Sequence, residues 1–194
     1  MLVGLSKSAA LDYSYWTVSR AGLSSPSWSL VLSIIRPILR CCESYILCDI
    51  SLGVEDLLEH FHRHNIPMAL TTSSSEESFH MKTDHLKDII SIFHHVVTGS
   101  SDPEVKNGKP APDIFKICAS RFPGNPVYSK FLVFDESPNG VTAALAAGMQ
   151  VVMVPDPILS IWHNMSTANA TYVLNSLEDF RPEMFSLPPY FTGS

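Results

Sequence analysis

A lysine on a turn-rich segment and a pair of adjacent acids are the residues of this chain best suited to chemistry. Residues 107–115 read Asn-Gly-Lys-Pro-Ala-Pro-Asp-Ile-Phe, so Lys109 lies in a segment punctuated by glycine and proline. Residues 131–140 read Phe-Leu-Val-Phe-Asp-Glu-Ser-Pro-Asn-Gly, an apolar run that stops at Asp135 and Glu136. Two carboxylates at a strand end suit Mg²⁺, and a lysine neutralises phosphate charge. The two segments together predict phosphoryl chemistry.

A hydroxyl-bearing segment completes this candidate site. Residues 68–71 are a short apolar run that predicts a strand, and Thr72 and Ser73 follow it directly. Right-handed crossovers bring the carboxyl ends of parallel strands to one edge of a sheet, so we expect Thr72 to lie near Lys109 and the acidic pair. A hydroxyl can donate to a phosphoryl oxygen, an ammonium offsets charge in the transition state, and two acids hold a metal ion.

Each of these residues also has a simpler interpretation. Thr72 alone can cap the following helix, and Lys109 alone can be a solvated surface side chain. The adjacent acids Asp135 and Glu136 can begin a helix, where negative charge is favoured by the helix dipole. The ordered combination of the three segments is what favours a phosphate site.

The elements that position these residues follow from a regular apolar pattern that begins near residue 50. Helices are predicted at residues 54–64, from Ser75 onward, and at residues 86–93, 112–120 and 140–147. Strands are predicted at residues 68–71, 96–97, 131–134, 151–154 and 172–174. Helices that alternate with short apolar strands favour an α/β fold with a parallel sheet covered on both faces.

Composition narrows the possible partners. The chain has 194 residues, 45% hydrophobic residues and a net charge of −6, which predicts one domain without an affinity for nucleic acid or for an anionic membrane. The apolar run at residues 28–39 contains Arg36 and Pro37 and is shorter than the roughly 20 residues of a membrane span. The four cysteines form no CxxC motif, which indicates reduced thiols and a cytoplasmic location. The sequence leaves the oligomeric state open.

Residues 52–187 resemble the haloacid dehalogenase-like (HAD) phosphatases. The resemblance rests on Ala-Leu-Thr-Thr-Ser-Ser at residues 69–74 and on the Gly-Lys-Pro-x-Pro-Asp-x-Phe block at residues 108–115. It also rests on the acidic pair that runs through a glycine into an alanine-rich helix at residues 133–149. A narrower resemblance, to one nucleotide phosphatase of this family, depends on residues 147–156 and on Asp-Pro-Glu-Val at residues 102–105.

The resemblance implies a HAD-like Rossmannoid core and Mg²⁺-dependent hydrolysis of a phosphorylated small molecule, either a nucleotide or a sugar phosphate. It assigns phosphate binding to Thr72, Ser73 and Lys109, with catalytic roles for Thr72 and Lys109, and it assigns the metal to Asp135 and Glu136. The family usually has Glu before Asp at the last two positions, whereas here the order is reversed. The reversal puts the longer side chain where the principal metal ligand is expected.

The same resemblance identifies what is missing. HAD phosphatases open with an apolar strand that ends in Asp-x-Asp, whose first acid attacks phosphorus and whose second is the general acid and base. A helical cap domain then follows. No segment before residue 52 matches either part, so the first strand and the cap are expected to be missing or replaced. We predict a divergent, poorly ordered segment at residues 1–50, a core at residues 51–188 and a tail at residues 189–194.

Asp49 is the acid best placed to stand in for the missing nucleophile. It follows residues 45–48, which can form a strand, although Ser51 takes the place of the second acid. Alternatively, residues 45–48 fill the vacant first-strand position without chemistry. A parallel sheet that lacked this central strand would expose unpaired backbone groups and would be doubtful in isolation.

Three functions remain open at this stage. The first is a HAD-type phosphatase-like protein that is catalytically impaired because the nucleophilic aspartate is absent. The second is a non-catalytic binding or regulatory partner of an intact HAD phosphatase. The third is a competent phosphatase for another phosphate ester, which requires Asp49 to react.

Overall fold

A six-stranded parallel sheet organises this computed structural model, which describes residues 29–32, 39–41, 48–50, 53–155 and 166–190. The strand order is β5-β4-β1-β6-β7-β8, and every neighbouring pair is parallel. The strands are β1 (Ser29–Leu32), β4 (Met68–Thr72), β5 (Val96–Thr98), β6 (Phe131–Asp135), β7 (Gln150–Met153) and β8 (Tyr172–Val173). The predicted α/β class with a parallel sheet is confirmed.

Within the described residues, five α-helices flank the sheet. They are α1 (Val54–Arg63), α2 (Glu76–Thr83), α3 (Lys87–Ser91), α4 (Asp113–Ser120) and α5 (Pro138–Ala146). Short 3₁₀ helices are η2 (Asp84–Leu86), η3 (Tyr128–Lys130), η4 (Leu177–Asp179) and η5 (Pro182–Phe185). Each predicted helix is present, because the apolar residues at helical spacing and the capping residues indicate the same segments. At the start of α2, for example, the Ser75 hydroxyl accepts a hydrogen bond from the Ser78 amide.

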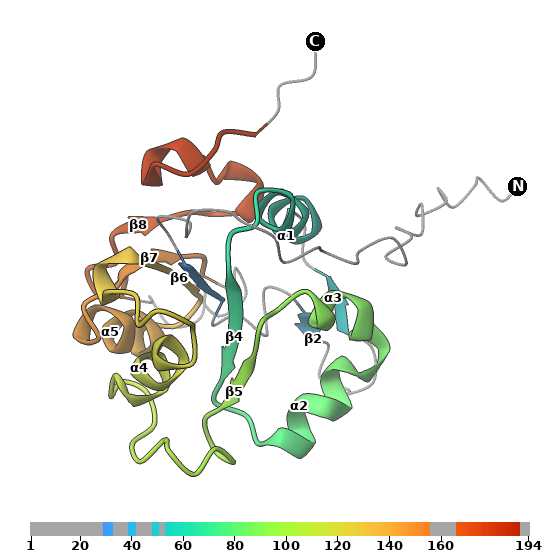
Figure 1. Cartoon of the computed structure of the whole chain (residues 1–194), viewed down its shortest axis with the longest axis vertical. Helices are drawn as coiled ribbons and strands as arrows, with labels where there is room; N and C mark the ends of the chain where they lie inside the picture. Colours follow the sequence, from blue (N-terminus) through green and yellow to red (C-terminus); the bar gives the residue numbers. More distant parts are fainter. Residues whose placement is uncertain (1–28, 33–38, 42–47, 51–52, 156–165, 191–194) are drawn as a thin grey trace, which may run out of the picture.

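Successive side chains of each strand point to opposite faces of the sheet, so the hydrophobic core has two halves. In β4, Met68 and Leu70 belong to one buried cluster, whereas Ala69 belongs to the other. The first cluster contains α1 and the C-terminal segment, and the second contains α4 and α5. Figure 1 shows the same arrangement, with α4 and α5 on one side of the strands and α1 with the C-terminal segment on the other. Strands buried on both faces explain the continuous apolar runs in the sequence.

The central strand of the sheet differs from the sequence prediction. β1 (Ser29–Leu32) lies between β4 and β6, and Leu32 pairs with both Leu70 and Phe134. The prediction that residues 45–48 fill this position is therefore wrong. The expectation that the family's first strand is missing or replaced holds, since residues 29–32 take the central position. The predicted poor order of residues 1–50 concerns, apart from the strands at residues 29–32, 39–41 and 48–50, positions outside the described residues, and so do residues 191–194 of the predicted tail.

Asp49 belongs to a different sheet. It lies in β3 (Cys48–Ile50), which pairs antiparallel with β2 (Leu39–Cys41). This two-stranded sheet is separate from the six-stranded one. The backbone of Asp49 therefore does not continue any strand that leads to Thr72 or to Asp135.

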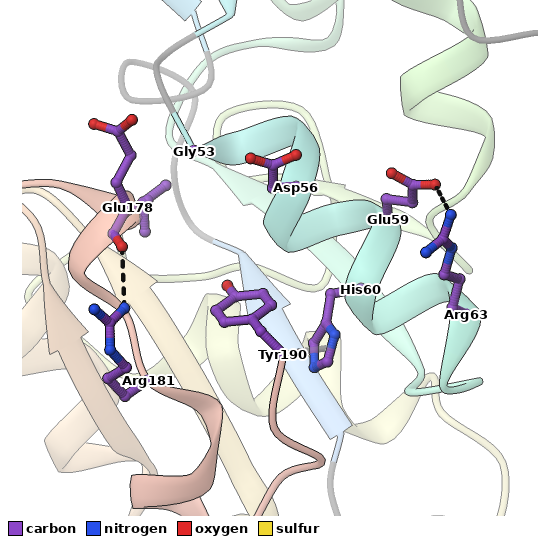
Figure 2. Close-up of a pocket in the computed structure, with 9 residues that line it drawn as sticks. Gly53, Asp56, Glu59, His60, Arg63, Glu178, Arg181 and Tyr190 are labelled. Atoms are coloured by element: carbon purple, nitrogen blue, oxygen red, sulfur yellow. Dashed lines mark hydrogen bonds and ion pairs between the residues drawn. The ribbon is translucent and has the colours of Figure 1, made fainter. Parts of the chain in front are cut away.

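The C-terminal segment packs against α1 around a buried histidine. Nε2 of His60 lies 2.8 Å from the carbonyl oxygen of Pro188, and the rings of His60 and Tyr190 are 4.6 Å apart. Figure 2 shows Tyr190 and His60 side by side at the base of a pocket of about 390 Å³ between α1 and residues 177–190. Burial raises the pKa of Tyr190 to about 12, and Asp56 adds to this shift.

His60 makes stability depend on pH. Its side chain is 6% exposed, and burial is the main cause that lowers its pKa below 6.5, while the Pro188 contact opposes that shift. The unfolded chain then binds the proton more readily, so the contribution to the free energy of unfolding is present above about pH 6.5 and is lost as the pH falls below it. Burial also lowers the pKa of His62 and His95, in the same direction.

We expect His60→Gln to weaken this pH dependence, because glutamine does not titrate and can still donate to the Pro188 carbonyl. Urea unfolding at pH 7.5, 6.5 and 5.5 measures the effect. The wild-type protein should lose more of its free energy of unfolding between pH 7.5 and 5.5 than the variant does. Parallel pH profiles of the two proteins would show that His60 does not carry this dependence.

Candidate active site

The carboxyl edge of the sheet brings together two of the three predicted segments. β1 separates β4 from β6, and its residue Leu32 is level with Leu70 and Phe134. Thr72 and Asp135 therefore lie near the same edge, two strand spacings apart, or about 10 Å between backbones. The third segment is the loop of residues 99–112, which runs from β5 to α4 and carries Lys109.

A buried ion pair joins that loop to the sheet. Nζ of Lys109 lies 2.7 Å from Oδ2 of Asp135, and the two side chains are 10% and 1% exposed. The ammonium also lies 5.2 Å from the centroid of the buried Phe115 ring, within range of a cation–π interaction. The peptide bond between Lys109 and Pro110 is cis. The structure thus places the predicted lysine directly against the first of the two predicted acids.

The first turn of α5 holds the other side of the same carboxylate. Oδ1 of Asp135 accepts hydrogen bonds from the amide and the hydroxyl of Ser137, at 2.8 and 2.9 Å. The Ser137 hydroxyl in turn accepts from the Gly140 amide at 3.0 Å, as an N-cap with Pro138 in the first turn. A Cβ on Gly140 would lie about 2.0 Å from the Asp135 carboxylate atoms, so only glycine allows this approach.

Thr72 and Ser73, at the end of β4, both make hydrogen bonds to nearby residues. Thr72 is 5% exposed, and its Oγ1 accepts from the Ser74 amide at 3.0 Å. Ser73 is exposed, and its carbonyl oxygen accepts from the Ser100 hydroxyl at 2.7 Å. Ser75, and not Thr72, is the N-cap of α2. The helix-capping interpretation of Thr72 is therefore wrong, and its hydroxyl instead organises the turn that follows the strand.

Glu136 follows Asp135 at the same edge and is partly buried. The structure adds no third protein ligand to the predicted pair of Asp135 and Glu136. The described residues contain no group of three or more histidine, cysteine or acidic side chains that could hold a metal ion. Asp135 has committed one oxygen to Lys109 and the other to Ser137. Most of its acceptor capacity is therefore already used.

No acid follows the central strand in the sequence. β1 ends at Leu32, and the next three residues of the chain are Ser33, Ile34 and Ile35. Asp49, the acid that the sequence offered instead, lies in the separate β2–β3 sheet. The structure does not bring Asp49 into the six-stranded sheet whose edge carries Thr72 and Asp135.

Sequence reasoning missed the residues that hold this site in place. Ser137 and Gly140 fix the Asp135 carboxylate, and the Ser-Pro-x-Gly spacing after the acidic pair is an N-cap signature that could have indicated it. Thr71, on β4 beside Thr72, is fully buried, and its hydroxyl has no hydrogen-bond partner. No sequence signal distinguished Thr71 from its neighbour.

Comparison with known proteins identifies the family. Residues 31–148 match the model of the haloacid dehalogenase-like hydrolases, and the chain belongs to this family. The match begins within β1, which agrees with the position of that strand in the sheet. The predicted HAD resemblance and fold are therefore confirmed.

The chain is similar to two curated phosphatases. The probable pseudouridine-5′-phosphatase of Drosophila melanogaster is 54% identical over 138 residues, covering 71% of this chain and 58% of that protein. The (DL)-glycerol-3-phosphatase 2 of Arabidopsis thaliana is 48% identical over 139 residues, covering 71% of this chain and 56% of that protein. The narrower sequence resemblance, which was to pseudouridine-5′-phosphatase, is confirmed. The chain spans a little over half the length of these relatives.

A solved structure supports the fold alone. The crystal structure of a mutant CbbY from Rhodobacter sphaeroides in complex with xylulose-(1,5)bisphosphate superposes with a TM-score of 0.58 at 21% identity. The match covers 68% of this chain and 56% of that one. In the described parts of the chain, we find no helix with the length and apolar character needed to cross a membrane.

Gly140→Ala tests the packing of the Asp135 carboxylate. A methyl group about 2.0 Å from that carboxylate must displace it from Lys109 and Ser137, so we expect a loss of about 1–3 kcal/mol in the free energy of unfolding. Gly108→Ala is the matched control, because a Cβ there has no neighbour within 4 Å, and its effect should stay within about 0.5 kcal/mol. Urea unfolding measures both, and equal stability of the two variants would contradict the close approach.

Proposed function

We propose that this chain binds a phosphorylated small molecule, a nucleotide or a sugar phosphate, at the carboxyl edge of its sheet. We further propose that it hydrolyses such esters far more slowly than an intact HAD phosphatase. The observation that carries the proposal is the Lys109 ammonium, held 2.7 Å from Asp135 beside the end of the central strand. A fixed cation at the carboxyl end of a parallel sheet suits an anionic ligand.

The proposed phosphate lies across the end of β1, between β4 and β6. Lys109 supplies positive charge from one side, and Thr72 and Ser73 supply hydroxyl and backbone donors from the other. The gap of about 10 Å between the backbones of β4 and β6 can be spanned by a phosphate group that is hydrogen-bonded on both sides. All three residues lie within residues 31–148, the part of the chain that matches the family model, and the sequence resemblance assigns them to phosphate binding.

Mg²⁺ is typical of HAD phosphatases, and the chain retains two acids that fit it. Mg²⁺ is commonly held by one or two carboxylates together with phosphate oxygens and water. Because Asp135 already pairs with Lys109 and Ser137, we assign the larger share of metal binding to Glu136, with Asp135 beside it. A bound ion would neutralise phosphate charge.

Slow hydrolysis follows from the sequence after the central strand. The family attacks phosphorus with an aspartate after the first strand, whereas Ser33 follows β1 here. A serine hydroxyl attacks phosphorus readily only when a base activates it, whereas the family's aspartate is a nucleophile as a carboxylate. Asp49 lies in a separate sheet and does not follow the central strand, so it does not take the chain position of the family's nucleophile that the third function requires.

The substrate class comes from the relatives. One is described as a pseudouridine-5′-phosphatase and the other as a (DL)-glycerol-3-phosphatase, so both act on small phosphate monoesters. We propose the same ligand class for this chain, without nucleic acid as a partner. The buried thiol of Cys118, which forms no disulfide, agrees with the cytoplasmic location that the cysteine pattern predicts.

Turnover and binding test the two parts of this proposal separately. Phosphate release from pseudouridine 5′-phosphate and from glycerol 3-phosphate, with Mg²⁺, should be at least about a thousandfold slower than for the full-length Drosophila relative assayed in parallel. Calorimetric titration with inorganic phosphate should nevertheless show binding. Turnover at the relative's rate, abolished by Lys109→Ala, would contradict the impairment.

The binding measurement needs a variant that leaves no buried, unpaired charge. Lys109→Ala alone strands the Asp135 carboxylate, whereas Lys109→Ala combined with Asp135→Asn keeps an oxygen for Ser137 without the negative charge. We expect phosphate affinity to fall about tenfold in the double variant, since a charge-assisted contact is lost. Unchanged affinity would place the anion elsewhere on the protein.

A further inference from the structure

A bridging arginine joins the loop that carries Lys109 to the end of α4, and it has no role in the function described so far. Arg121 directly follows α4, and its Nη1 lies 2.7 Å from Oδ2 of Asp102. Its Nη2 lies 2.5 Å from Oε2 of Glu104. The Asp102 side chain is 9% exposed, whereas that of Glu104 is 64% exposed. The two acids belong to the Asp-Pro-Glu-Val segment, which the sequence singled out without indicating its purpose.

Both acids lie in the loop of residues 99–112 that carries Lys109, and the first part of that loop is tied to the hydroxyl segment. The Gly99 amide donates to the Thr72 carbonyl at 2.6 Å, and the Ser100 hydroxyl donates to the Ser73 carbonyl at 2.7 Å. The Ser101 hydroxyl accepts from the Glu76 amide at 2.9 Å. The start of the loop is thus fixed relative to β4.

Helix α4 holds the remainder of the loop from its two ends. At its first residue, Oδ2 of Asp113 accepts from the amide and the side chain of Asn107, at 2.9 and 3.1 Å. Just past its last residue, Arg121 holds Asp102 and Glu104. Lys109 lies between Asn107 and Asp113 in the chain. Its backbone position therefore depends on the Asn107–Asp113 contact at the start of α4 and on the Arg121 contacts at the end of α4.

Asp102 makes the bridge rigid. Its Oδ1 accepts from the Glu104 amide at 3.1 Å, and its own amide donates to the Thr98 carbonyl at 2.8 Å at the end of β5. The hydrogen bond from Arg121 is the main cause that lowers the pKa of Asp102, so the carboxylate stays charged. A guanidinium reaches both acids through its planar fork, which a lysine ammonium cannot reproduce.

We propose that Arg121 is a positioning residue that holds the Lys109 loop at the distance needed for Lys109 to face the bound phosphate. The proposal deepens the proposed function, since it concerns the same site. Arg121 acts through Lys109, by fixing residues 102–104 against the end of α4. Without the bridge the loop moves away from β6, and the contact between Lys109 and Asp135 opens more often.

The first test measures Lys109 itself and needs no ligand. Reductive methylation with formaldehyde and cyanoborohydride, followed by mass spectrometry, reports how often the Lys109 amine leaves its buried pair. We expect Arg121→Gln to raise the labelling rate of Lys109 about fivefold. Arg121→Lys should give an intermediate rate, because one ion pair survives. Arg63→Gln is the matched control: it breaks the 2.6 Å pair with Glu59 on α1 and should leave the Lys109 rate unchanged.

The second test is a double-mutant cycle in which the measured quantity is the affinity for inorganic phosphate. Arg121→Gln should weaken binding of inorganic phosphate about tenfold when Lys109 is present. It should have no further effect in the Lys109→Ala, Asp135→Asn background, because a residue that acts only through Lys109 has nothing left to position. A purely structural role of Arg121 would weaken binding equally in both backgrounds.

The outcomes separate this inference from the proposed function. Absence of phosphate binding by the wild-type protein would overturn the proposed function, and the labelling rate would still decide the positioning role. An unchanged labelling rate in Arg121→Gln, or equal losses of affinity in both backgrounds, would overturn that role. If Arg121→Gln does not fold, Glu104→Gln is the replacement variant, because it removes only the exposed ion pair of the bridge. A Lys109 labelling rate equal to that of the wild type in both Glu104→Gln and Arg121→Lys would then overturn the inference.

Discussion

The buried ion pair between Lys109 and Asp135 is the interaction on which the rest of the site depends. Asp135 is 1% exposed, and burying a carboxylate at that depth is costly unless it is paired and hydrogen-bonded. Two separate elements supply its partners: the loop of residues 99–112 through Lys109, and the N-cap of α5 through Ser137. Removal of one partner from a buried pair typically costs about 3–5 kcal/mol. The lysine to which we assign the positive charge for a ligand is therefore also one that holds the loop to the sheet.

The central strand gives this pair its functional setting. β1 pairs with β4 on one side and with β6 on the other, so it fixes the spacing between the hydroxyl segment and the ion pair. It does so although Ser33, and not an aspartate, follows it. The position of the strand and the chemistry of the residue after it are separable, because backbone pairing depends on the apolar residues of the strand and not on the side chain beyond its end. In the function we propose, the central strand thus keeps the spacing of the phosphate site, although the sequence has Ser33 after that strand.

Most of the fold between residues 54 and 155 could be predicted from the sequence, because the local signals agree there. Apolar periodicity, the Ser75 cap and the glycine after α5 all indicate the same elements that the structure contains. β1 could not be recognised, since its four residues lie in an apolar stretch soon interrupted by Arg36 and Pro37, and residues 45–48 have an equally suitable composition. Strands of three or four residues are distinguished by their partners, and pairing is a long-range property that one sequence does not reveal.

The candidate site was predicted by residue but not by contact, and Asp135 shows why. The sequence assigned it to a metal ion, since two adjacent acids at a strand end are typical metal ligands. Its partners depend on where a loop 26 residues away along the chain returns to the sheet, and on a glycine whose missing side chain admits the carboxylate. The reversed order of the two acids now has a physical consequence. The shorter side chain, at position 135, accepts from Ser137 and Lys109 and lies against Gly140, where a Cβ would be about 2.0 Å from the carboxylate atoms. The order Asp then Glu therefore gives the lysine-paired carboxylate to the first position, which is why we assign the proposed metal ion mainly to Glu136 at the second.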